Sequence, residues 1–455
     1  FPPWAALFGF VPLWLFWSRQ TTLWPILIGG WITQFLLTSI GFSWIAYNIH
    51  EFGALPWVVA ILGMIIFCSF ANIYIPIAGG LWWLLSKTFT IGRWARLILI
   101  GLITSLCEMY LQTIFHWNFA YTWMWVDFPI YQLAEFVGFS GLSSLIIIAN
   151  SILLIAWLRK KEKIGKIYFA SIFILFFFLN FLGLSRARHL PPPNAVMRPL
   201  IVQGNISNQQ KIYAEQGWGF RQYISQKFLS LTQQHLTDEQ YTDFALWPET
   251  AFPDYLNVTS QATVRALKAF LKNNNLPLIT GGYTLHPQQK SSNSLYFINP
   301  EADHFKQRYD KSILLAFGEY IPGSTTFPIL KRWLPMVADF YRGPGPSVID
   351  FLNIKIGAQI CYESLYPGFS QKLSELGAEV ILNVTNDSWF GWWQEPYQHL
   401  IMTLARGIEF RRPIVRATNT GISTVMLANG QILEKSPIDK EWAYTYLVPF
   451  IKNPR

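Results

Sequence analysis

Three residues in the second half of the chain have side chains that together can form and break an acyl bond. Glu249 closes the segment "DFALWPE", Lys311 follows "HFKQRYD", and Cys361 follows the apolar run "IKIGAQI". A thiol attacks a carbonyl carbon as a thiolate, which requires a neighbouring base or cation. A carboxylate can take the thiol proton, and an ammonium can stabilise an oxyanion. These residue types favour nucleophilic catalysis by Cys361, without a histidine.

Each of the three residues also fits a structural role when it is considered alone. Glu249 fits an acid at a surface strand end, Lys311 a solvated loop lysine, and Cys361 a buried core residue. Cys361 is the only cysteine after residue 187, so it has no partner there for an internal disulfide. Cys68 and Cys107 lie in hydrophobic runs and are expected to be core residues.

The strands and helices that must position these residues are expected within residues 196–445. Short apolar segments such as "PLIVQGNI", "LPLITGGY" and "AEVILNVTN" alternate there with helix-like segments such as "SQATVRALKAFLKN". This alternation predicts one α/β domain in which helices cover a buried sheet. Catalytic side chains gather at strand ends in such sheets. Glu249, Lys311 and Cys361 all fall at or just past predicted strand ends.

Residues 1–187 have a different composition and predict a transmembrane helical bundle. Only 13% of the whole chain is charged, against about 25% in soluble domains. A membrane helix needs about 20 apolar residues. About six candidate spans approach or exceed that length: 3–18, 23–48, 56–86, 94–115, 133–158 and 167–185.

The connections between these spans predict the orientation of the chain. If the spans alternate, one set of connections carries nine lysines and arginines, including the segment "RKKEKIGK", while the other set carries none. Positive connections stay in the cytoplasm, so the folded domain is expected on the opposite side of the membrane. The net charge of +9 is explained by this topology and does not predict nucleic-acid binding.

Four motifs of the folded domain resemble the carbon–nitrogen hydrolase (nitrilase) superfamily and its Glu–Lys–Cys triad. They are "LWPETAFP", "RYDKSILLAFGEYIP", "GAQICYES" and "NVTNDSWFG". Membrane spans ahead of such a domain are specifically similar to the bacterial apolipoprotein N-acyltransferases. The resemblance covers nearly the whole chain and implies a nitrilase-like αββα sandwich outside the membrane.

The resemblance also implies roles for individual residues. Glu249 would be the general base, Lys311 the cation that stabilises the oxyanion, and Cys361 the nucleophile, with Glu319 and Glu363 supporting them. Cys361 would take an acyl chain from a phospholipid, typically phosphatidylethanolamine. It would pass that chain to the α-amine of a diacylglyceryl-cysteine on an apolipoprotein, by a ping-pong mechanism. No cofactor is implied, and the expected location is the bacterial inner membrane with the catalytic domain in the periplasm.

Other residues are expected to contact substrate or lipid. Trp389, Phe390, Trp392 and Trp393 belong to or follow "SWFG", and Trp392 and Trp393 fit either lipid-facing lid residues or core residues. Glu108 lies inside a predicted span, where a bare charge is costly. It fits either a hydrogen bond within the bundle or a role near the lipid headgroup.

The chain also departs from the family pattern. The family usually has a tryptophan where this chain has Ile212, and it has further spans at both ends. We therefore expect those flanking spans to be missing and residues 446–455 to begin a return toward the membrane. The seven histidines show no ligand spacing, so no metal site is predicted.

Two alternative functions are compatible with some of these sequence features. A membrane-tethered amidase would use the same triad but let water resolve the acyl-enzyme. A transporter or scaffold would carry a folded domain that has lost catalysis, although such a domain would have no reason to retain all three triad residues.

Overall fold

The structure is a computed structural model, and its backbone contacts divide the chain into two compact units. The first unit comprises Phe1–His50 and Ala54–Leu190, and the second comprises Glu51–Gly53 and Pro191–Arg455. The structure describes residues 6–53, 55–111, 115, 117–215, 219–236, 241–258, 262–287, 290–302, 304–333, 337 and 339–454.

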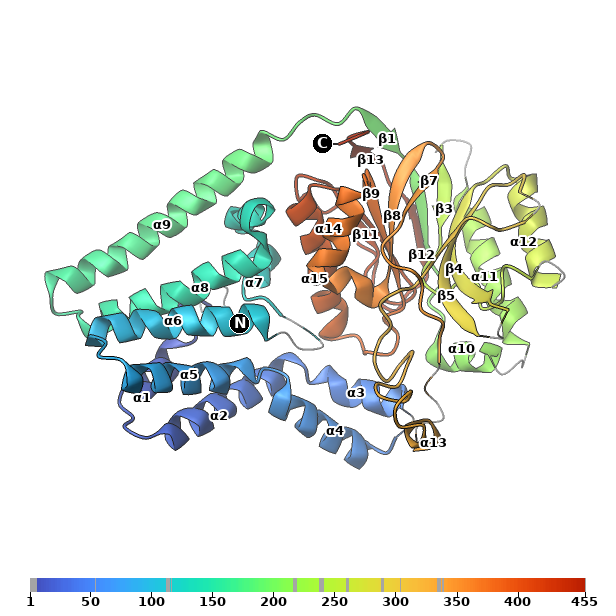
Figure 1. Cartoon of the computed structure of the whole chain (residues 1–455). Coiled ribbons are helices and arrows are strands. Elements are labelled where there is room, and N and C mark those ends of the chain that lie inside the picture. The colour runs from blue at the N-terminus through green and yellow to red at the C-terminus, as the bar shows by residue number, and fades with distance from the viewer. Residues whose placement is uncertain are drawn as a thin grey trace. The chain divides into compact units, whose positions relative to one another are not determined.

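The described part of the first unit is helical (Figure 1). Its elements are α1 (Val11–Trp17), α2 (Leu23–Gly41), α3 (Trp44–Glu51), α4 (Trp57–Phe70), α5 (Tyr74–Thr88), α6 (Arg93–Tyr110), α7 (Tyr121–Trp125), the 3₁₀ helix η2 (Pro129–Leu133), α8 (Ala134–Leu158) and α9 (Lys163–Arg188).

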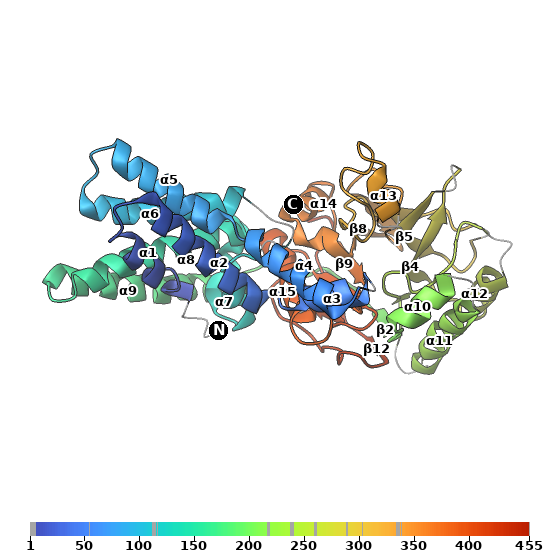
Figure 2. The same ribbon diagram turned by 90° about the horizontal axis from the view of Figure 1, so that it is seen from below.

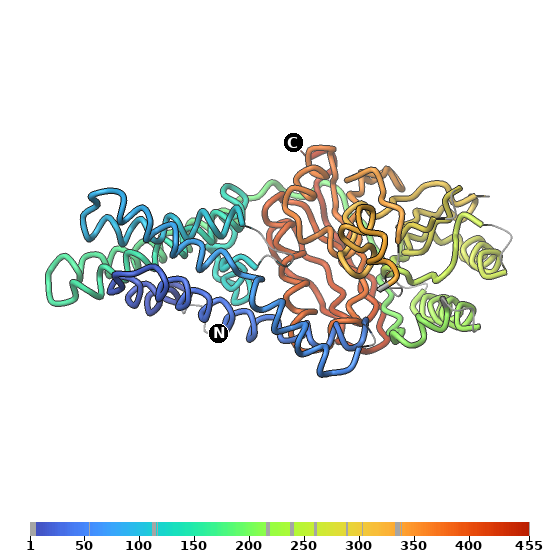
Figure 3. The backbone as a smooth tube through the Cα atoms, turned by 60° about the horizontal axis from the view of Figure 1, so that its bottom comes forward, coloured from blue at the N-terminus to red at the C-terminus, as the bar shows by residue number. Residues whose placement is uncertain are grey.

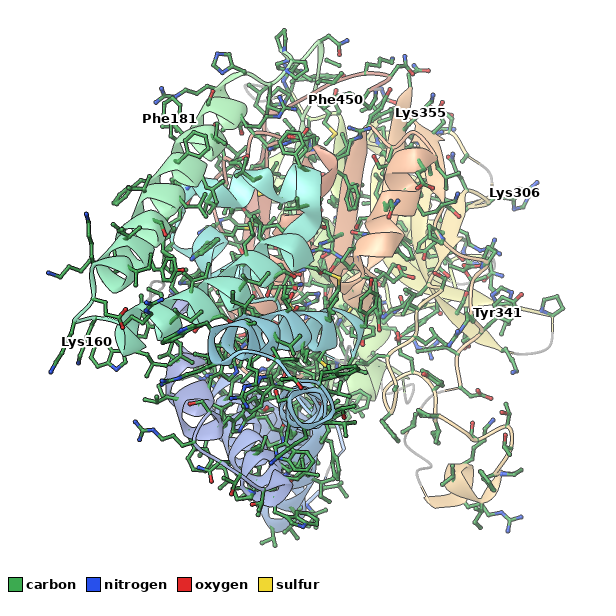
Figure 4. The ribbon with its side chains drawn as sticks, turned by 60° about the vertical axis from the view of Figure 1, so that its left-hand side comes forward. Lys160, Phe181, Lys306, Tyr341, Lys355 and Phe450 are labelled. Carbon is green, nitrogen blue, oxygen red and sulfur yellow. The ribbon has the colours of Figure 1, made fainter. Side chains whose placement is uncertain are left out.

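Four helical segments among the described residues are long and apolar enough to cross a membrane. They are Leu23–Gly41, Trp57–Thr88, Pro129–Leu158 and Lys163–Arg188. The outward side of α9 is strongly apolar: Phe181 is 66% exposed, and Lys160 lies at the turn before this helix (Figure 4). Such a surface is typical of a helix that faces lipid.

The expected spans differ from the observed helices in three places. The span expected over 23–48 is interrupted between α2 and α3. The span expected over 56–86 corresponds to the segment Trp57–Thr88, which a turn at residues 71–73 divides into α4 and α5. The described part of 3–18 contains only the seven-residue helix α1. The expected span 94–115 is helical as α6, but Arg93, Arg96 and Glu108 make it more polar than the four long segments. Apolar composition alone did not reveal these breaks.

The second unit contains two large β-sheets. In the six-stranded sheet the order is β12 (Trp442–Thr445), β2 (Pro199–Gln203), β3 (Phe244–Leu246), β4 (Leu278–Leu285), β5 (Ser291–Ile298) and β6 (Arg308–Asp310). In the five-stranded sheet the order is β11 (Thr424–Met426), β10 (Ile414–Thr418), β9 (Val380–Thr385), β8 (Ile354–Ile360) and β7 (Val348–Phe351).

Helices cover the outer faces of both sheets, which gives an αββα sandwich as expected (Figures 1 and 3). Helices α11 (Phe220–His235) and α12 (Ala262–Asn273) lie on the six-stranded sheet, with α10 (Asn208–Glu215) beside them (Figure 2). Helices α14 (Pro367–Glu375) and α15 (Glu395–Phe410) cover the five-stranded sheet. Strands β2, β3, β9 and β10 are buried along their whole length, which explains why most of their residues are apolar.

The strand register sets which side chains meet at the ends of the sheets. Strands β8 and β9 run parallel, with Ile360 opposite Val384, so Cys361 and Thr385 follow at neighbouring positions. Strand β3 runs parallel to both β2 and β4 and leads directly to Glu249. Cys361 and Glu249 therefore follow strands of different sheets of one sandwich.

The last part of the chain forms a strand in its described residues. Residues Val448–Phe450 make β13, which pairs antiparallel with β1 (Ala195–Met197). Residues 446–455 were expected to begin a return toward the membrane, which stays a prediction; within that range, residues 448–450 form this strand of the second unit.

Candidate active site

Cys361 lies at a sharp change of direction between β8 and the 3₁₀ helix η3 (Cys361–Leu365). Its φ angle is +53°, a left-handed conformation that is rare for residues other than glycine. The residue is 8% exposed. Strained backbone of this kind is concentrated at functional sites, where the surrounding structure maintains it.

Glu363 holds this turn against the segment that carries Lys311. Its Oε2 accepts a hydrogen bond from the backbone N–H of Ile360 at 2.8 Å. Its Oε1 accepts from the Tyr309 hydroxyl at 2.6 Å and from the backbone N–H of Ser312 at 2.7 Å. Burial raises the pKa of Glu363, and these hydrogen bonds oppose that shift. Glu363 therefore positions the nucleophile and the cation relative to each other.

Glu363→Gln is expected to destabilise the protein. The amide N–H₂ of glutamine must face N–H or O–H groups that donate hydrogen bonds to the carboxylate of Glu363. Leaving buried donors unsatisfied costs about 1–3 kcal/mol, which predicts a melting temperature lower by roughly 4–12 °C. The check is thermal unfolding of the detergent-solubilised protein. Glu375→Gln is the control, because the Glu375 side chain on α14 is 51% exposed. Equal melting temperatures for the two variants would contradict the structural role of Glu363.

Glu249 is held by three donors just beyond the end of β3. Its Oε1 accepts hydrogen bonds from Asn293 Nδ2 at 2.7 Å and from Lys311 Nζ at 3.2 Å. Its Oε2 accepts from the backbone N–H of Asn386 at 2.9 Å. Asn293 lies on β5, and Asn386 immediately follows β9. Both sheets therefore contribute to the position of this carboxylate.

Gly281 lets the loop that carries Glu249 lie against β4. A Cβ at this position would stand 2.5 Å from the backbone nitrogen of Thr250 and 2.6 Å from the carbonyl oxygen of Pro248. Both neighbours are backbone atoms, which cannot move aside as a flexible side chain would. The second glycine of the "ITGGY" segment, Gly282, approaches the side chain of Leu256 instead.

Gly281→Ala is expected to displace Glu249 and to lower acyl-enzyme formation at least tenfold. Overpacking of this kind also destabilises a protein by about 1–3 kcal/mol. The measurements are the rate of acyl-enzyme formation and the melting temperature. The matched control is Gly368→Ala on α14, where an added Cβ would meet no heavy atom within 4 Å. Full activity of the Gly281 variant would show that the loop tolerates displacement.

Lys311 is enclosed by two carboxylates. Its Nζ donates to Glu249 Oε1 at 3.2 Å and to Glu319 Oε1 at 2.9 Å, and its side chain is 2% exposed. Burial alone lowers the pKa of Lys311, but Glu249, Glu319 and Cys361 outweigh burial and raise this pKa well above its usual value. The residue is therefore an ammonium held next to the nucleophile.

The electrostatics of Cys361 combine opposing influences. Burial raises the pKa of the Cys361 thiol well above its usual value, and the negative charge of Glu249 raises it further. Lys311 and a hydrogen bond with the Thr385 side chain lower the pKa. The resting sulfur is therefore a neutral thiol. A proton must leave it during attack, and Glu249 is the nearby carboxylate suited to accept that proton.

The structure brings together the five ionisable or nucleophilic residues that the sequence singled out in the folded domain, namely Glu249, Lys311, Glu319, Cys361 and Glu363. Lys311 bridges Glu249 and Glu319 directly, and the charges of Glu249 and Lys311 both act on Cys361.

The expected contact residues lie in different environments. Trp392 is 66% exposed and its ring packs edge-on against Trp393. Trp389 makes an edge-to-face contact, with ring centroids 5.0 Å apart, with Phe52, which also belongs to the second unit. Phe390 is buried at 7% exposure, which fits packing within the domain better than contact with lipid.

Two further expected positions lie on other elements. Ile212 is 38% exposed on α10. Glu108 is buried in the first unit, where its Oε1 accepts a hydrogen bond from the Ser143 hydroxyl at 3.0 Å.

Sequence reasoning missed several polar residues around the site. Asn293 supports Glu249, and Thr385 contacts Cys361. Asp387, Glu395 and His399 form a buried cluster that was not predicted, in which His399 Nδ1 and Asp387 Oδ1 are hydrogen-bonded at 3.0 Å. The available signal was polarity inside otherwise apolar strands, together with the four-residue spacing of Glu395 and His399 on α15.

Comparisons with known proteins agree with this architecture. The carbon–nitrogen hydrolase family model matches residues 201–445, and the model of the apolipoprotein N-acyltransferase N-terminal domain matches residues 2–152. Apolipoprotein N-acyltransferase of Bdellovibrio bacteriovorus is 41% identical, with 100% of this chain and 85% of that protein covered. The Geobacter metallireducens protein of the same name is 27% identical, with 90% and 79% covered.

Among solved structures, the nitrilase-superfamily member Nit3 of Saccharomyces cerevisiae is similar at 14% identity and a TM-score of 0.43, over 56% of this chain and 91% of that chain. The family assignment rests on the two family models and on the relative that matches the full length of this chain. The chain belongs to the apolipoprotein N-acyltransferase family, and its second unit is a carbon–nitrogen hydrolase domain.

Proposed function

We propose that the protein transfers an acyl chain from a phospholipid to the terminal amine of a lipoprotein through a thioester on Cys361. The observation that carries this proposal is the buried network in which Lys311 bridges Glu249 and Glu319 and acts electrostatically on the Cys361 thiol. A thioester divides a difficult ester-to-amide transfer into two easier steps.

In the first half-reaction, the Cys361 thiol gives its proton to the Glu249 carboxylate as sulfur attacks the ester carbonyl carbon. The Lys311 ammonium is suited to stabilise the oxyanion that develops on the former carbonyl oxygen. The carbon–oxygen bond of the ester then breaks, and the Glu249 carboxyl returns its proton to the alcohol of the leaving lysophospholipid. The products are the thioester on Cys361 and a free lysophospholipid.

In the second half-reaction, a neutral amine attacks the thioester carbon. Glu249 accepts a proton from the attacking nitrogen, and the carbon–sulfur bond breaks to give an amide and the Cys361 sulfur. The sulfur recovers its proton from Glu249, which restores the starting state. One carboxylate can serve both half-reactions because each needs a proton first accepted and then returned.

The proposed donor is phosphatidylethanolamine, and the proposed acceptor is the α-amine of an S-diacylglyceryl-cysteine. Both molecules are anchored in a bilayer, which explains why a carbon–nitrogen hydrolase domain is joined to long apolar helices. The charge asymmetry of the helix connections supports an inner-membrane location with the catalytic domain in the periplasm. The domain boundaries that we propose are 1–187 for the bundle and 196–445 for the catalytic domain.

A two-stage mass measurement tests this function. The detergent-purified full chain is incubated with phosphatidylethanolamine, and its intact mass is expected to rise by one acyl group. Addition of a diacylglyceryl-cysteine peptide is expected to remove that mass and to give an N-acylated peptide. Matched incubations use the same peptide with a blocked α-amine, which should leave the acyl-enzyme in place.

Two results would overturn the proposal. One is the absence of any lipid adduct, combined with hydrolysis of small amides, which would instead indicate an amidase. The other is an adduct that decays at the same rate with and without the free-amine peptide, because water would then be the acceptor.

A further inference from the structure

Thr385 occupies a position that the proposed mechanism does not yet use. It is the last residue of β9, and the parallel register of β8 and β9 places it beside Cys361. Its side chain is fully buried. The Thr385 hydroxyl donates to Asp387 Oδ1 at 3.1 Å, and a hydrogen bond of the Thr385 side chain with Cys361 lowers the pKa of the thiol. A hydroxyl has one hydrogen to donate, and in this structure Asp387 accepts it.

Asp387 is fixed by buried partners other than Thr385. Its Oδ2 accepts a hydrogen bond from Arg416 Nη2 at 2.8 Å, in a pair whose side chains are both fully buried. Its Oδ1 also accepts from His399 Nδ1 at 3.0 Å, and the same nitrogen lies 3.3 Å from Glu395 Oε1. Gly421 packs so closely against the Asp387 carboxylate that it leaves no space for a Cβ.

These partners keep Asp387 ionised whether or not Thr385 donates to it. Burial acts to raise the pKa of Asp387, but Arg416 and His399 outweigh burial and hold this pKa below its usual value. Asp387 retains two cationic or proton-donating partners when the Thr385 hydrogen turns away. Asp387 thus holds the Thr385 hydroxyl next to the sulfur, and the hydrogen of this hydroxyl can turn away from Asp387 at small cost.

We propose that the Thr385 hydroxyl is a catalytic hydrogen-bond donor to the Cys361 sulfur, kept in place by Asp387 until the thiol loses its proton. This inference rests on the proposed function and deepens it. When the thiol proton passes to Glu249, the Thr385 hydrogen turns from Asp387 Oδ1 to the new sulfur anion, with no bond to Thr385 broken. The positive charge of Lys311 stabilises the sulfur anion electrostatically, and Thr385 donates a directed hydrogen bond to it.

The test measures the thiol itself and needs no lipid substrate. The full chain is alkylated with iodoacetamide over a range of pH, and modification of the Cys361 peptide is followed by mass spectrometry. Thr385→Val keeps the shape and removes the hydroxyl. It is expected to slow alkylation about tenfold near neutral pH and to move the midpoint of the profile about one pH unit upward. Thr385→Ser is expected to restore the parent profile.

The control is Thr232→Val, which removes an equally buried hydroxyl that hydrogen-bonds Trp247 Nε1 and the Phe228 carbonyl. If Thr385→Val does not fold, Thr385→Ala removes the same hydroxyl without an added methyl group. A folded variant without the hydroxyl that keeps the parent alkylation profile would overturn the inference. A parent enzyme that shows the expected thiol profile but no acyl transfer would refute the proposed function and leave the thiol inference standing.

Discussion

Cys361→Ala is expected to abolish both acyl-enzyme formation and transfer to the acceptor, because the proposed pathway has no other nucleophile. Cys361 joins β8 to η3 in a left-handed conformation, where the Lys311 ammonium and the Glu249 carboxylate act on its sulfur. Alanine removes the atom that forms the thioester and changes little else in this buried site. The expected loss is therefore complete within the sensitivity of intact-mass detection.

Two variants make this result specific to Cys361. Cys107→Ala removes a buried cysteine from α6 in the first unit and is expected to acylate like the parent. Cys361→Ser replaces the thiol with a hydroxyl, whose much higher pKa leaves it far less nucleophilic, so it should remain nearly inactive. A lipid adduct on Cys361→Ala would show that the acyl group is carried elsewhere.

Most of the catalytic domain could be predicted from its sequence, because its strands are short apolar runs separated by helix-like segments. The αββα sandwich and the carbon–nitrogen hydrolase family were both expected and are confirmed. The helical unit was predicted less accurately. Expected spans continued through the breaks at residues 42–43 and 71–73, because these breaks contain no proline or charge and each has a single polar residue, Ser43 or Asn72.

The residues around the nucleophile show why a site is harder to predict than a fold. Glu249 and Asn293 are 44 positions apart, and Glu249 and Asn386 are 137 apart. Only the register of the strands brings such residues together. Arg416 and Asp387 illustrate the same point, since a fully buried ion pair cannot be distinguished in sequence from two surface charges. The motifs predicted which residues carry the chemistry, and the tertiary structure shows which residues contact them.

Glu249→Gln is the second variant with a large expected effect. Glutamine keeps the size of the side chain but cannot accept the thiol proton. Its amide N–H₂ is also a donor, as are Asn293 and Lys311, which donate hydrogen bonds to the Glu249 carboxylate. General acid–base catalysis typically contributes about 10²–10⁴ in rate, so acyl-enzyme formation should fall by that factor. The measurement is the initial rate of acylation by phosphatidylethanolamine across a range of pH.

Glu319→Gln separates the loss of a base from the loss of an ion pair. Both variants remove one of the two carboxylates that contact the Lys311 ammonium. The charge of Glu249 acts on the Cys361 thiol, whereas Glu319 contacts the Lys311 ammonium through Oε1 and accepts a hydrogen bond from the backbone N–H of Leu315 through Oε2. We therefore expect Glu319→Gln to lose much less activity than Glu249→Gln. Alkylation of Cys361 should persist in Glu249→Gln, because loss of the negative charge of Glu249 lowers the pKa of the thiol, yet acyl transfer should stay low without an acid for the leaving alcohol. Equal losses in the two variants would assign Glu249 to holding Lys311 rather than to moving protons.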